Sequence, residues 1–411
     1  MYKFPHNFFW GAATAAHQVE GNNLNNDWWR WEKEAGLKEK SGLACRHYEL
    51  YEEDFALASA LNHNAHRLSV EWSRIEPEEG KFSEKEIKHY KDVISALRKS
   101  GLEPVVTLHH FTNPAWFADK GGWSSKASLR YFLRFTETIV SELCGQVRFW
   151  VTINEPMVYT YQSYVLGLWP PQEKSLFKAK TVADNLVAGH IAAYRLIHKI
   201  YKDRLLPEVF VSIAKNCQAF EPCLDSLRNK LGVALRNHFF NFWFLEKLIR
   251  VHSLDFIGVN YYTRGLVDVS SWLPRNLLLD TSRPGISSLQ KNGLGWDIYP
   301  RGLYKLLLRL KRYALPVFIL ENGICTQDDS LRWKFIYDHL KELSRAMEEG
   351  VEVLGYIYWS LIDNFEWDKG FSPRFGLIEV DYSNFKRTVR ESARKLDAVC
   401  KNGVLLDESA G

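Results

Sequence analysis

Two glutamates stand at the ends of short apolar segments of the sequence. Residues 149–153 (FWVTI) are followed by Asn154 and Glu155, and residues 316–320 (PVFIL) are followed by Glu321. Such runs are typical of strands that are buried on both faces, so each strand would present one carboxyl group at its carboxyl end. A pair of carboxyl groups can cleave a glycosidic bond, because one protonates the leaving oxygen while the other attacks the anomeric carbon or activates a water.

Short apolar runs alternate with longer amphipathic segments along the whole chain. The runs predict eight strands, at residues 8–13, 65–70, 103–108, 149–153, 208–212, 256–259, 317–320 and 353–358. Apolar residues at helical spacing predict helices at 48–61, 83–100, 126–143, 181–201, 226–248, 303–313, 329–349 and 387–401. Residues 264–295 are rich in Pro, Gly and Ser and are interpreted as a loop.

Eight strand and helix units in succession predict an α/β fold with a single (β/α)8 barrel, also called a TIM barrel. No linker or internal repeat divides the chain, so we expect residues 1–411 to form one catalytic domain. The alternative is a doubly wound open sheet, but no glycine-rich phosphate-binding fingerprint follows any strand. In a barrel the active site lies at the carboxyl ends of the strands.

Polar and aromatic residues gather at these predicted strand ends. They are Gln18, His109, His110, Asn154, Glu155, Asn260, Tyr262, Glu321, Trp359, Glu366 and Trp367, and Arg67 lies inside the second strand. Amide, imidazole and carboxyl groups can bind sugar hydroxyls, and an aromatic ring can pack on the flat C–H face of a sugar. The two histidines have no third candidate ligand at a suitable spacing, so no metal and no cofactor are expected.

Composition disfavours several other classes of function. The net charge is only +4 and no basic run stands out, so nucleic acid is not expected as a partner. No apolar run approaches the roughly 20 residues that a transmembrane helix needs, so no membrane association is expected. The first residues do not resemble a secretory signal, which favours the cytoplasm. The six scattered cysteines form no CxxC pair and are expected to be free thiols.

Several segments of the chain resemble glycoside hydrolase family 1, the β-glucosidase family. They are FWGAAT (9–14), QVEG (18–21), RLSVEWSRI (67–75), TINEP (152–156), VNYY (259–262), LENG (320–323) and YWSLIDNFEW (358–367). They occur in the order found in that family, and each lies in or next to a predicted strand. The resemblance implies a TIM barrel and a retaining, exo-acting β-glycosidase, with a β-glucosidase favoured and β-galactosyl or β-fucosyl substrates also considered.

The resemblance also implies roles for the two carboxyl groups. Glu155 matches the acid/base and Glu321 the nucleophile of a double displacement that passes through a covalent glycosyl-enzyme. Retaining enzymes hold these groups about 5–5.5 Å apart. Arg67 and Tyr262 match residues that support the nucleophile. Asn154 matches the residue that binds the sugar 2-hydroxyl.

The remaining site residues carry over in the same way. Gln18, His110, Glu366 and Trp367 match partners of the other hydroxyls. Trp359 matches the platform beneath the sugar ring, and Phe375 is expected to close the edge of that site, where Tyr262 is also expected to contact the substrate. The implied ligand is a small β-glycoside or oligosaccharide.

Three alternatives remain open within this resemblance. A 6-phospho-β-glycosidase has the same fold, but it typically replaces the Glu-Trp pair that is intact here as Glu366 and Trp367. A transglycosylase has the same catalytic residues, and a non-catalytic sugar-binding relative would have lost one of the two glutamates. The chain also departs from the family pattern at Met157, where many members carry Trp. Aglycone specificity is therefore not implied.

Overall fold

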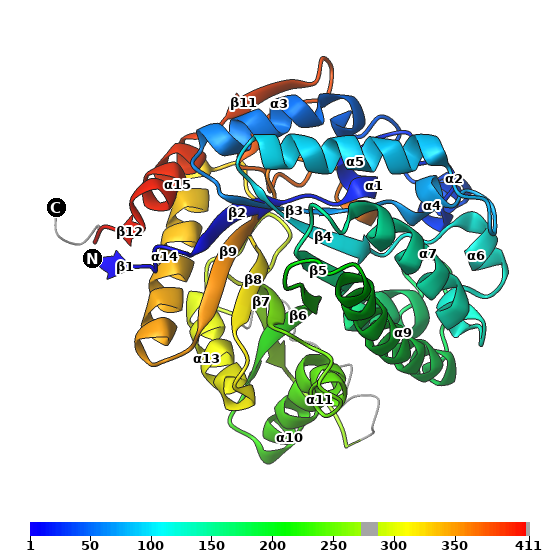
Figure 1. The fold of residues 1–411 in the computed structure, drawn as a ribbon. Coiled ribbons are helices and arrows are strands. Elements are labelled where there is room, and N and C mark those ends of the chain that lie inside the picture. Colours follow the sequence, from blue (N-terminus) through cyan, green and yellow to red (C-terminus); the bar gives the residue numbers. More distant parts are fainter. Residues whose placement is uncertain (273–286, 408–411) are drawn as a thin grey trace.

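Eight parallel strands form a closed barrel at the centre of the molecule (Figure 1). The computed structural model describes residues 1–272 and 287–407. Neighbouring strands pair in chain order and the last pairs with the first, which confirms the predicted (β/α)8 barrel. The strands are β2 Phe9–Ala13, β3 Ala65–Ser69, β4 Glu103–His109, β5 Phe149–Asn154, β6 Phe210–Pro222, β7 Ile257–Val267, β8 Val317–Asn322 and β9 Val353–Trp359.

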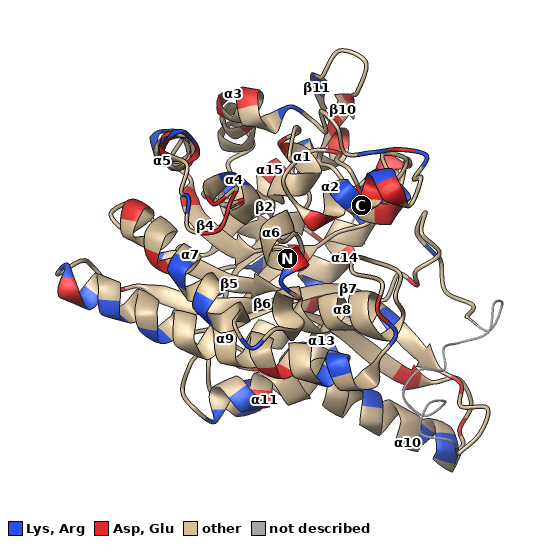
Figure 2. Ribbon diagram, turned by 90° about the vertical axis from the view of Figure 1, so that its right-hand side faces the viewer, with Lys and Arg blue, Asp and Glu red and all other residues tan. Residues whose placement is uncertain are grey.

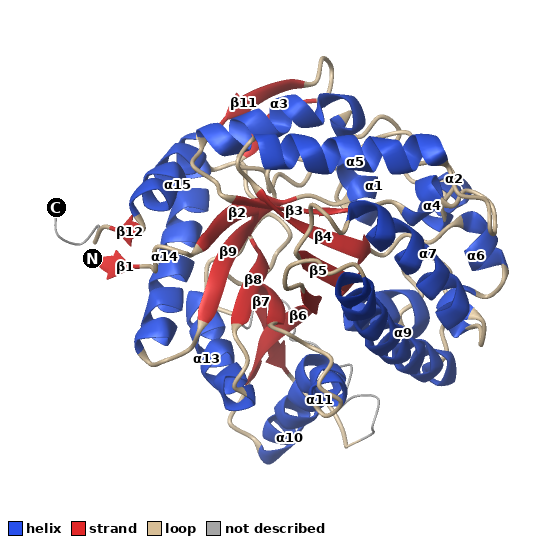
Figure 3. Ribbon diagram, viewed as in Figure 1, coloured by secondary structure: helices blue, strands red, loops and turns tan. Residues whose placement is uncertain are grey.

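Helices surround the strands (Figure 3). The longer ones are α3 His47–Ala60, α5 Glu84–Lys99, α7 Ser128–Leu143, α9 Leu176–Asp203, α10 Leu227–Arg236, α13 Pro300–Leu310, α14 Asp329–Glu348 and α15 Glu391–Asn402. Shorter turns are α1 Ala16–Val19, α2 Asp27–Glu34, α4 Trp72–Ile75, α6 Ala115–Asp119, α8 Pro156–Thr160, α11 Trp243–Ile249, η1 Gly122–Ser124, η2 Tyr161–Val165, η3 Asn237–Phe242, η4 Lys311–Tyr313 and η5 Trp367–Lys369. Charged residues recur along the outer helices α5 and α9 (Figure 2).

The amino-terminal end of the barrel is closed by phenylalanine rings. Phe149, at the start of β5, has its ring centroid 5.3 Å from that of Phe9, 5.0 Å from that of Phe210 and 6.1 Å from that of Phe318. Phe9 and Phe210 are the first residues of β2 and β6, and Phe318 is the second residue of β8. Because the rings occupy the interior at this end, a cavity can open only at the carboxyl ends of the strands.

Local sequence rules account for the element ends that matter most here. The side chain of Ser83 accepts a hydrogen bond from the backbone N–H of Glu86 and so caps α5, as its position predicts. Asn62 adopts a left-handed conformation (φ 52°) directly after α3, which is a conformation that Asn tolerates better than most residues. Residues 90, 93, 94 and 97 of α5 are buried against the barrel at helical spacing.

Two strands are longer than the sequence pattern predicts. β6 and β7 were expected at 208–212 and 256–259, but they continue as a parallel pair to Pro222 and Val267. The loop interpretation of 264–295 is therefore wrong for its first residues, and its stretch 273–286 lies outside the described residues. The extension mixes polar, aromatic and apolar residues, so it lacks the continuous apolar run used for the prediction.

Two helix predictions also need correction. The helix expected at 226–248 is divided into α10 and α11 by η3, a π-helical turn. The last helix begins at Glu391 rather than at Arg387, since residues 386–389 form β11, which pairs with β10 (Ile378–Asp381). Alternation of apolar and polar residues in the two short strands was too brief to be recognised.

The first and last strands of the described chain lie side by side (Figure 1). β1 (Tyr2–Lys3) pairs antiparallel with β12 (Val404–Leu405). All six cysteines are free, as expected. In the described part of the chain, no helix is long and apolar enough to cross a membrane. The cytoplasmic location stays a prediction.

Gly323 is required where β8 passes β9. A Cβ atom at this position would lie 1.8 Å from the carbonyl oxygen of Trp359. We expect Gly323→Ala to lower the free energy of unfolding by about 1–3 kcal/mol or more, because main chain must shift to relieve the contact. Gly145→Ala is the matched control, since nothing lies within 4 Å of its added Cβ. Denaturant unfolding checks this, and equal stability of the two variants would contradict it.

Candidate active site

The two predicted glutamates line one cavity at the carboxyl end of the barrel. Its volume is about 800 Å³. Glu155 directly follows β5 and has a left-handed backbone conformation (φ 44°), while Glu321 lies within β8. Both side chains are buried. The negative charge of Glu321 is among the causes that raise the pKa of Glu155, so the two groups are electrostatically coupled.

Glu321 is held by two donors, one on each carboxyl oxygen. Arg67 Nη1 donates to Oε1 and forms a buried ion pair. Tyr262 Oη donates to Oε2 at 2.6 Å. Hydrogen bonds to a carboxylate favour its charged form, and a guanidinium beside it does so more strongly. The arrangement fixes the orientation of the Glu321 carboxyl group and places a positive charge beside it.

Glu155 lies in a different environment. Both of its described hydrogen bonds reach Oε1, from Asn260 Nδ2 at 2.8 Å and from Asn216 Nδ2 at 3.1 Å. Burial, followed by the charge of Glu321, raises the pKa of Glu155 to about 7. This carboxyl group can therefore carry a proton near neutral pH, while Glu321 does not need one.

Asn154 connects the two carboxyl groups. Its Oδ1 accepts hydrogen bonds from Arg67 Nη2 at 2.7 Å and from Asn260 Nδ2 at 3.2 Å. These contacts fix the amide orientation, so Nδ2 points to His110 Nε2 at 3.1 Å. Burial and the nearby Arg67 hold the pKa of His110 well below its usual range, so the imidazole is neutral. Its Nδ1 atom has no hydrogen-bond partner among the described residues.

A second carboxyl site lies across the cavity at Glu366. Gln18 Nε2 donates to Glu366 Oε2 at 3.3 Å and to the carbonyl of Phe365 at 2.9 Å. Burial and the charge of Glu321 raise the pKa of Glu366 to about 8. Gln18 Oε1 is buried at the cavity without a partner among the described residues. These groups can both donate to and accept from hydroxyl groups of a bound sugar.

Aromatic rings form the rest of this side of the cavity. The rings of Trp359 and Trp367 each stack with His110 at a centroid distance of 6.0 Å. Phe375 meets Tyr262 edge to face at 6.3 Å. Trp359, Trp367 and Phe375 all line the cavity and are almost fully buried. Flat apolar surface and hydroxyl-binding groups thus face the same space, which suits a pyranose ring.

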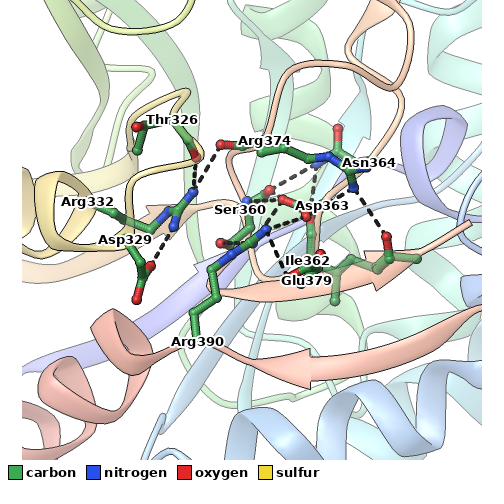
Figure 4. A network of polar contacts seen from close by, with 12 residues as sticks. Thr326, Asp329, Arg332, Ser360, Ile362, Asp363, Asn364, Arg374, Glu379 and Arg390 are labelled. Carbon is green, nitrogen blue, oxygen red and sulfur yellow. Dashed lines mark hydrogen bonds and ion pairs between the residues drawn. The ribbon is translucent and has the colours of Figure 1, made fainter.

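The loop that carries Glu366 and Trp367 is anchored by a buried charge network (Figure 4). Asp363 is fully buried and pairs with Arg390 Nη2 at 2.8 Å and with Arg374 Nη1 at 3.2 Å. Asn364 Nδ2 donates to Ser360 Oγ at 2.9 Å. A carboxylate this deep needs paired charge, so the network holds the loop in one conformation.

The structure brings all the predicted site residues together. Gln18, His110, Asn154, Glu155, Tyr262, Glu321, Trp359, Glu366, Trp367 and Phe375 line the cavity, and Arg67 lies behind Glu321 and Asn154. Among the described residues, no cluster of three or more His, Cys, Asp or Glu side chains could hold a metal ion. His109 instead contacts Asn113 and Trp123 within the protein.

Sequence reasoning missed two direct partners of Glu155. Asn260 was noted at the end of its strand but was not assigned to the site. Asn216 was overlooked because β6 was expected to end at residue 212, ten residues before its actual end. The polar residues that continue β6 beyond its apolar run were the available signal.

Burial of Glu155 predicts how stability depends on pH. Its pKa is about 7 in the folded protein, above the usual value near 4.5 expected on unfolding, so the folded state binds more protons between these values. Stability contributed by this group is therefore present below pH 4.5 and lost as pH rises to 7. We expect Glu155→Gln to raise the free energy of unfolding by about 2–3 kcal/mol at pH 8. Denaturant titrations at pH 4.5 and pH 8 check this, and an equal effect at both would contradict it.

Comparisons with known proteins give the family context of this site. The model of "Glycosyl hydrolase family 1" matches residues 1–252 and 246–404. Beta-glucosidase A of Thermotoga maritima is 30% identical, over 98% of this chain and 99% of that protein. A beta-galactosidase of Pyrococcus woesei is also 30% identical, over 98% of each.

Solved structures agree with these relatives. A beta-glycosidase from Pyrococcus horikoshii superposes with a TM-score of 0.93 at 41% identity, covering 99% of this chain and 97% of that one. The beta-glucosidase of Thermotoga maritima in complex with glucoimidazole has a TM-score of 0.91 at 28% identity, covering 98% of this chain and 100% of that one.

Proposed function

The chain belongs to glycosyl hydrolase family 1, and from this premise we propose that it is a retaining, exo-acting β-glycosidase that removes terminal β-D-glucosyl residues. It is a glycoside hydrolase. One observation carries the mechanism: two buried glutamates share a cavity, one paired with the guanidinium of Arg67 and the other, with a pKa of about 7, able to keep a proton near neutral pH. This division is what a double displacement requires.

In the first step Glu321 is the nucleophile. Its carboxylate attacks the anomeric carbon while the bond to the leaving oxygen breaks, and that oxygen takes the proton of Glu155. The product is an ester between Glu321 and the sugar. Arg67 and Tyr262 orient the attacking oxygens, and their hydrogen bonds support this assignment.

In the second step Glu155 becomes the base. Once Glu321 is an ester its negative charge is gone, and one cause of the raised pKa of Glu155 disappears with it. The pKa of Glu155 then falls, so the group is ionised when water arrives. Glu155 takes a proton from that water as its oxygen attacks the anomeric carbon, which releases the sugar and restores Glu321.

We infer that the walls around these groups recognise the sugar. Asn154 would bind the 2-hydroxyl, and Gln18, His110, Glu366 and Trp367 the other hydroxyls, with Trp359 and Phe375 packing on the ring. The unpartnered atoms Gln18 Oε1 and His110 Nδ1 support this, because buried polar atoms without partners are costly unless a ligand supplies one.

Particular residues of the cavity disfavour two other functions. Both glutamates are present in the cavity, which disfavours a non-catalytic sugar-binding role. A 6-phospho-β-glycosidase is disfavoured by the intact Glu366, although the raised pKa of that carboxyl group weakens its repulsion of a phosphate. The relatives compared here are named for glucosidase and galactosidase activity rather than for phosphorylated substrates. The balance between hydrolysis and transglycosylation depends on how well a second sugar competes with water.

A substrate panel tests the glycone. We expect 4-nitrophenyl β-glucoside to be hydrolysed, with β-galactoside and β-fucoside as the next best substrates and β-mannoside and 6-phospho-β-glucoside much poorer. The kcat/KM of each substrate is the measurement. If none of the five substrates is hydrolysed, the proposed enzyme activity is ruled out. If 6-phospho-β-glucoside is preferred, the protein is a 6-phospho-β-glycosidase and not a β-glucosidase.

Azide rescue tests the two carboxyl roles. Glu321→Gly should lower hydrolysis at least about 10³-fold, because the nucleophile is lost. Azide should restore turnover of 2,4-dinitrophenyl β-glucoside and form the α-glucosyl azide, since it attacks from the face that Glu321 occupied.

The matched variant is Glu155→Ala. It keeps the nucleophile, so azide should instead intercept the glycosyl-enzyme and form the β-glucosyl azide. NMR of the products distinguishes the two anomers. Exchange of the two outcomes between the variants would mean that the roles of Glu155 and Glu321 are reversed.

A further inference from the structure

A fully buried lysine lies beside the proposed acid/base. Lys215 belongs to β6 and none of its surface is exposed. Its Nζ donates to the main-chain carbonyl of Asn216 and lies 4.6 Å from the ring centroid of Phe240. Phe240 comes from η3, the π-helical turn that packs against β6. The ammonium group is thus enclosed between the barrel wall and its outer layer.

Nothing in its immediate contacts neutralises this charge. Among the described residues, no carboxylate oxygen lies within ion-pair distance of Lys215 Nζ. A carbonyl oxygen and a ring face stabilise an ammonium group only in part, and a buried charge without a counter-charge is costly. A cation in such a position usually has an anionic partner slightly farther away.

Burial lowers the pKa of Lys215, and two titratable groups oppose this shift. They are the thiol of Cys217 and the carboxyl group of Glu155. Burial raises the pKa of Cys217 to about 11, so this thiol is neutral at neutral pH and supplies no negative charge. Glu155 is therefore the group whose ionisation the lysine can favour.

The main chain ties the two residues together. The backbone N–H of Glu155 donates to the carbonyl of Ala214 at 2.7 Å, and Asn216 Nδ2 donates to Glu155 Oε1 at 3.1 Å. The residues on either side of Lys215 thus both bond to Glu155.

The groups around Glu155 act on its ionisation in opposite directions. The charge of Glu321 on β8 raises the pKa of Glu155, whereas the amides of Asn260 and Asn216 and the ammonium group of Lys215 lower it. Glu366 after β9, with a pKa of about 8, and Tyr262 on β7, whose pKa lies well above its usual value, are protonated near neutral pH. From β6, Cys217 is neutral as well. Lys215 thus supplies the positive charge among the groups that favour ionised Glu155.

We propose that Lys215 is a positioning residue for Glu155, and that its buried ammonium group is the positive charge against which Glu155 ionises when it acts as the base. The inference rests on the acid/base role proposed above. Lys215 lies behind the cavity wall and does not line the cavity, so it acts through Glu155 and not on the substrate.

Two substitutions test the charge separately from the hydrogen bond. Lys215→Met removes both, and Lys215→Gln removes the charge but keeps a donor for the carbonyl of Asn216. In wild type, the alkaline limb of kcat/KM is expected near pH 7, the pKa of Glu155. In both variants we expect this limb to move up by about 0.5–1 pH unit, because loss of a nearby positive charge disfavours the carboxylate.

The same change should slow the second step. At pH 5.5, breakdown of the glycosyl-enzyme should fall about 3–10-fold, since a smaller fraction of Glu155 is ionised. Burst kinetics with 2,4-dinitrophenyl β-glucoside measure this step. Phe240→Leu is the matched control: it alters the packing around the ammonium group but keeps the charge, so its alkaline limb should stay within about 0.2 pH unit of wild type.

A measurement without turnover separates this inference from the proposed function. At pH 8.5, Lys215→Met should lower Tm in the protein that retains Glu155, and it should lower Tm less in the Glu155→Gln background. We expect the two decreases to differ by at least about 2 °C, because only the protein that retains Glu155 is left with an uncompensated carboxylate. If wild type hydrolyses no glycoside, the proposed function fails and this difference still tests the pairing. If the limb does not move in folded Lys215→Gln, or the Tm difference is absent, Lys215 is only a structural residue and the inference is wrong.

Discussion

The guanidinium of Arg67 is the constraint on which the site depends. It is almost fully buried and reaches three other strands of the barrel, bonding Glu321 on β8, Asn154 on β5 and Thr107 on β4. A guanidinium cannot lose its charge in a protein, and its planar fork fixes where acceptors must lie. Once Arg67 is enclosed, Glu321 must stand opposite it as a carboxylate and Asn154 must present its oxygen.

The remaining carboxyl groups take their properties from this arrangement. Burial and the negative charge of Glu321 both disfavour ionisation of Glu155 and Glu366, so the pKa of each is raised. Chemically equivalent glutamates thereby become different reagents. The difference comes from hydrogen-bond donors: an arginine and a tyrosine on Glu321, but only neutral amides on Glu155.

The framework around these groups limits how far any of them can move. Phenylalanine rings fill the opposite end of the barrel, so strand ends at the open end stay in register. Trp367 is backed by Trp28, with ring centroids 4.6 Å apart, and by His17 at 5.9 Å. The buried Asp363 network fixes the loop between Trp359 and Trp367. The site is thus built on packed elements that require little rearrangement before a sugar binds.

Much of the fold and of the cavity lining could be predicted from the sequence, because the signals for them lie in short stretches of the chain. Apolar runs that end on polar residues mark strand ends, and in a parallel barrel all such ends meet at one face, so the sequence could bring the two glutamates and their polar and aromatic neighbours to one cavity without coordinates. The extended β6 and β7 escaped prediction, since polar residues such as Lys215 and Asn216 interrupt the apolar run that marks a strand.

Only the tertiary structure decided which side chains bond to which. Glu155 and Asn260 are 105 positions apart, and Arg67 and Glu321 are 254 apart. Contacts at such separations leave no periodic signal in a single chain. The same holds for Lys215, which reads as an ordinary polar residue after an apolar run. The role proposed for Lys215 depends on its burial and on the position of Glu155, and both are set only when the barrel closes.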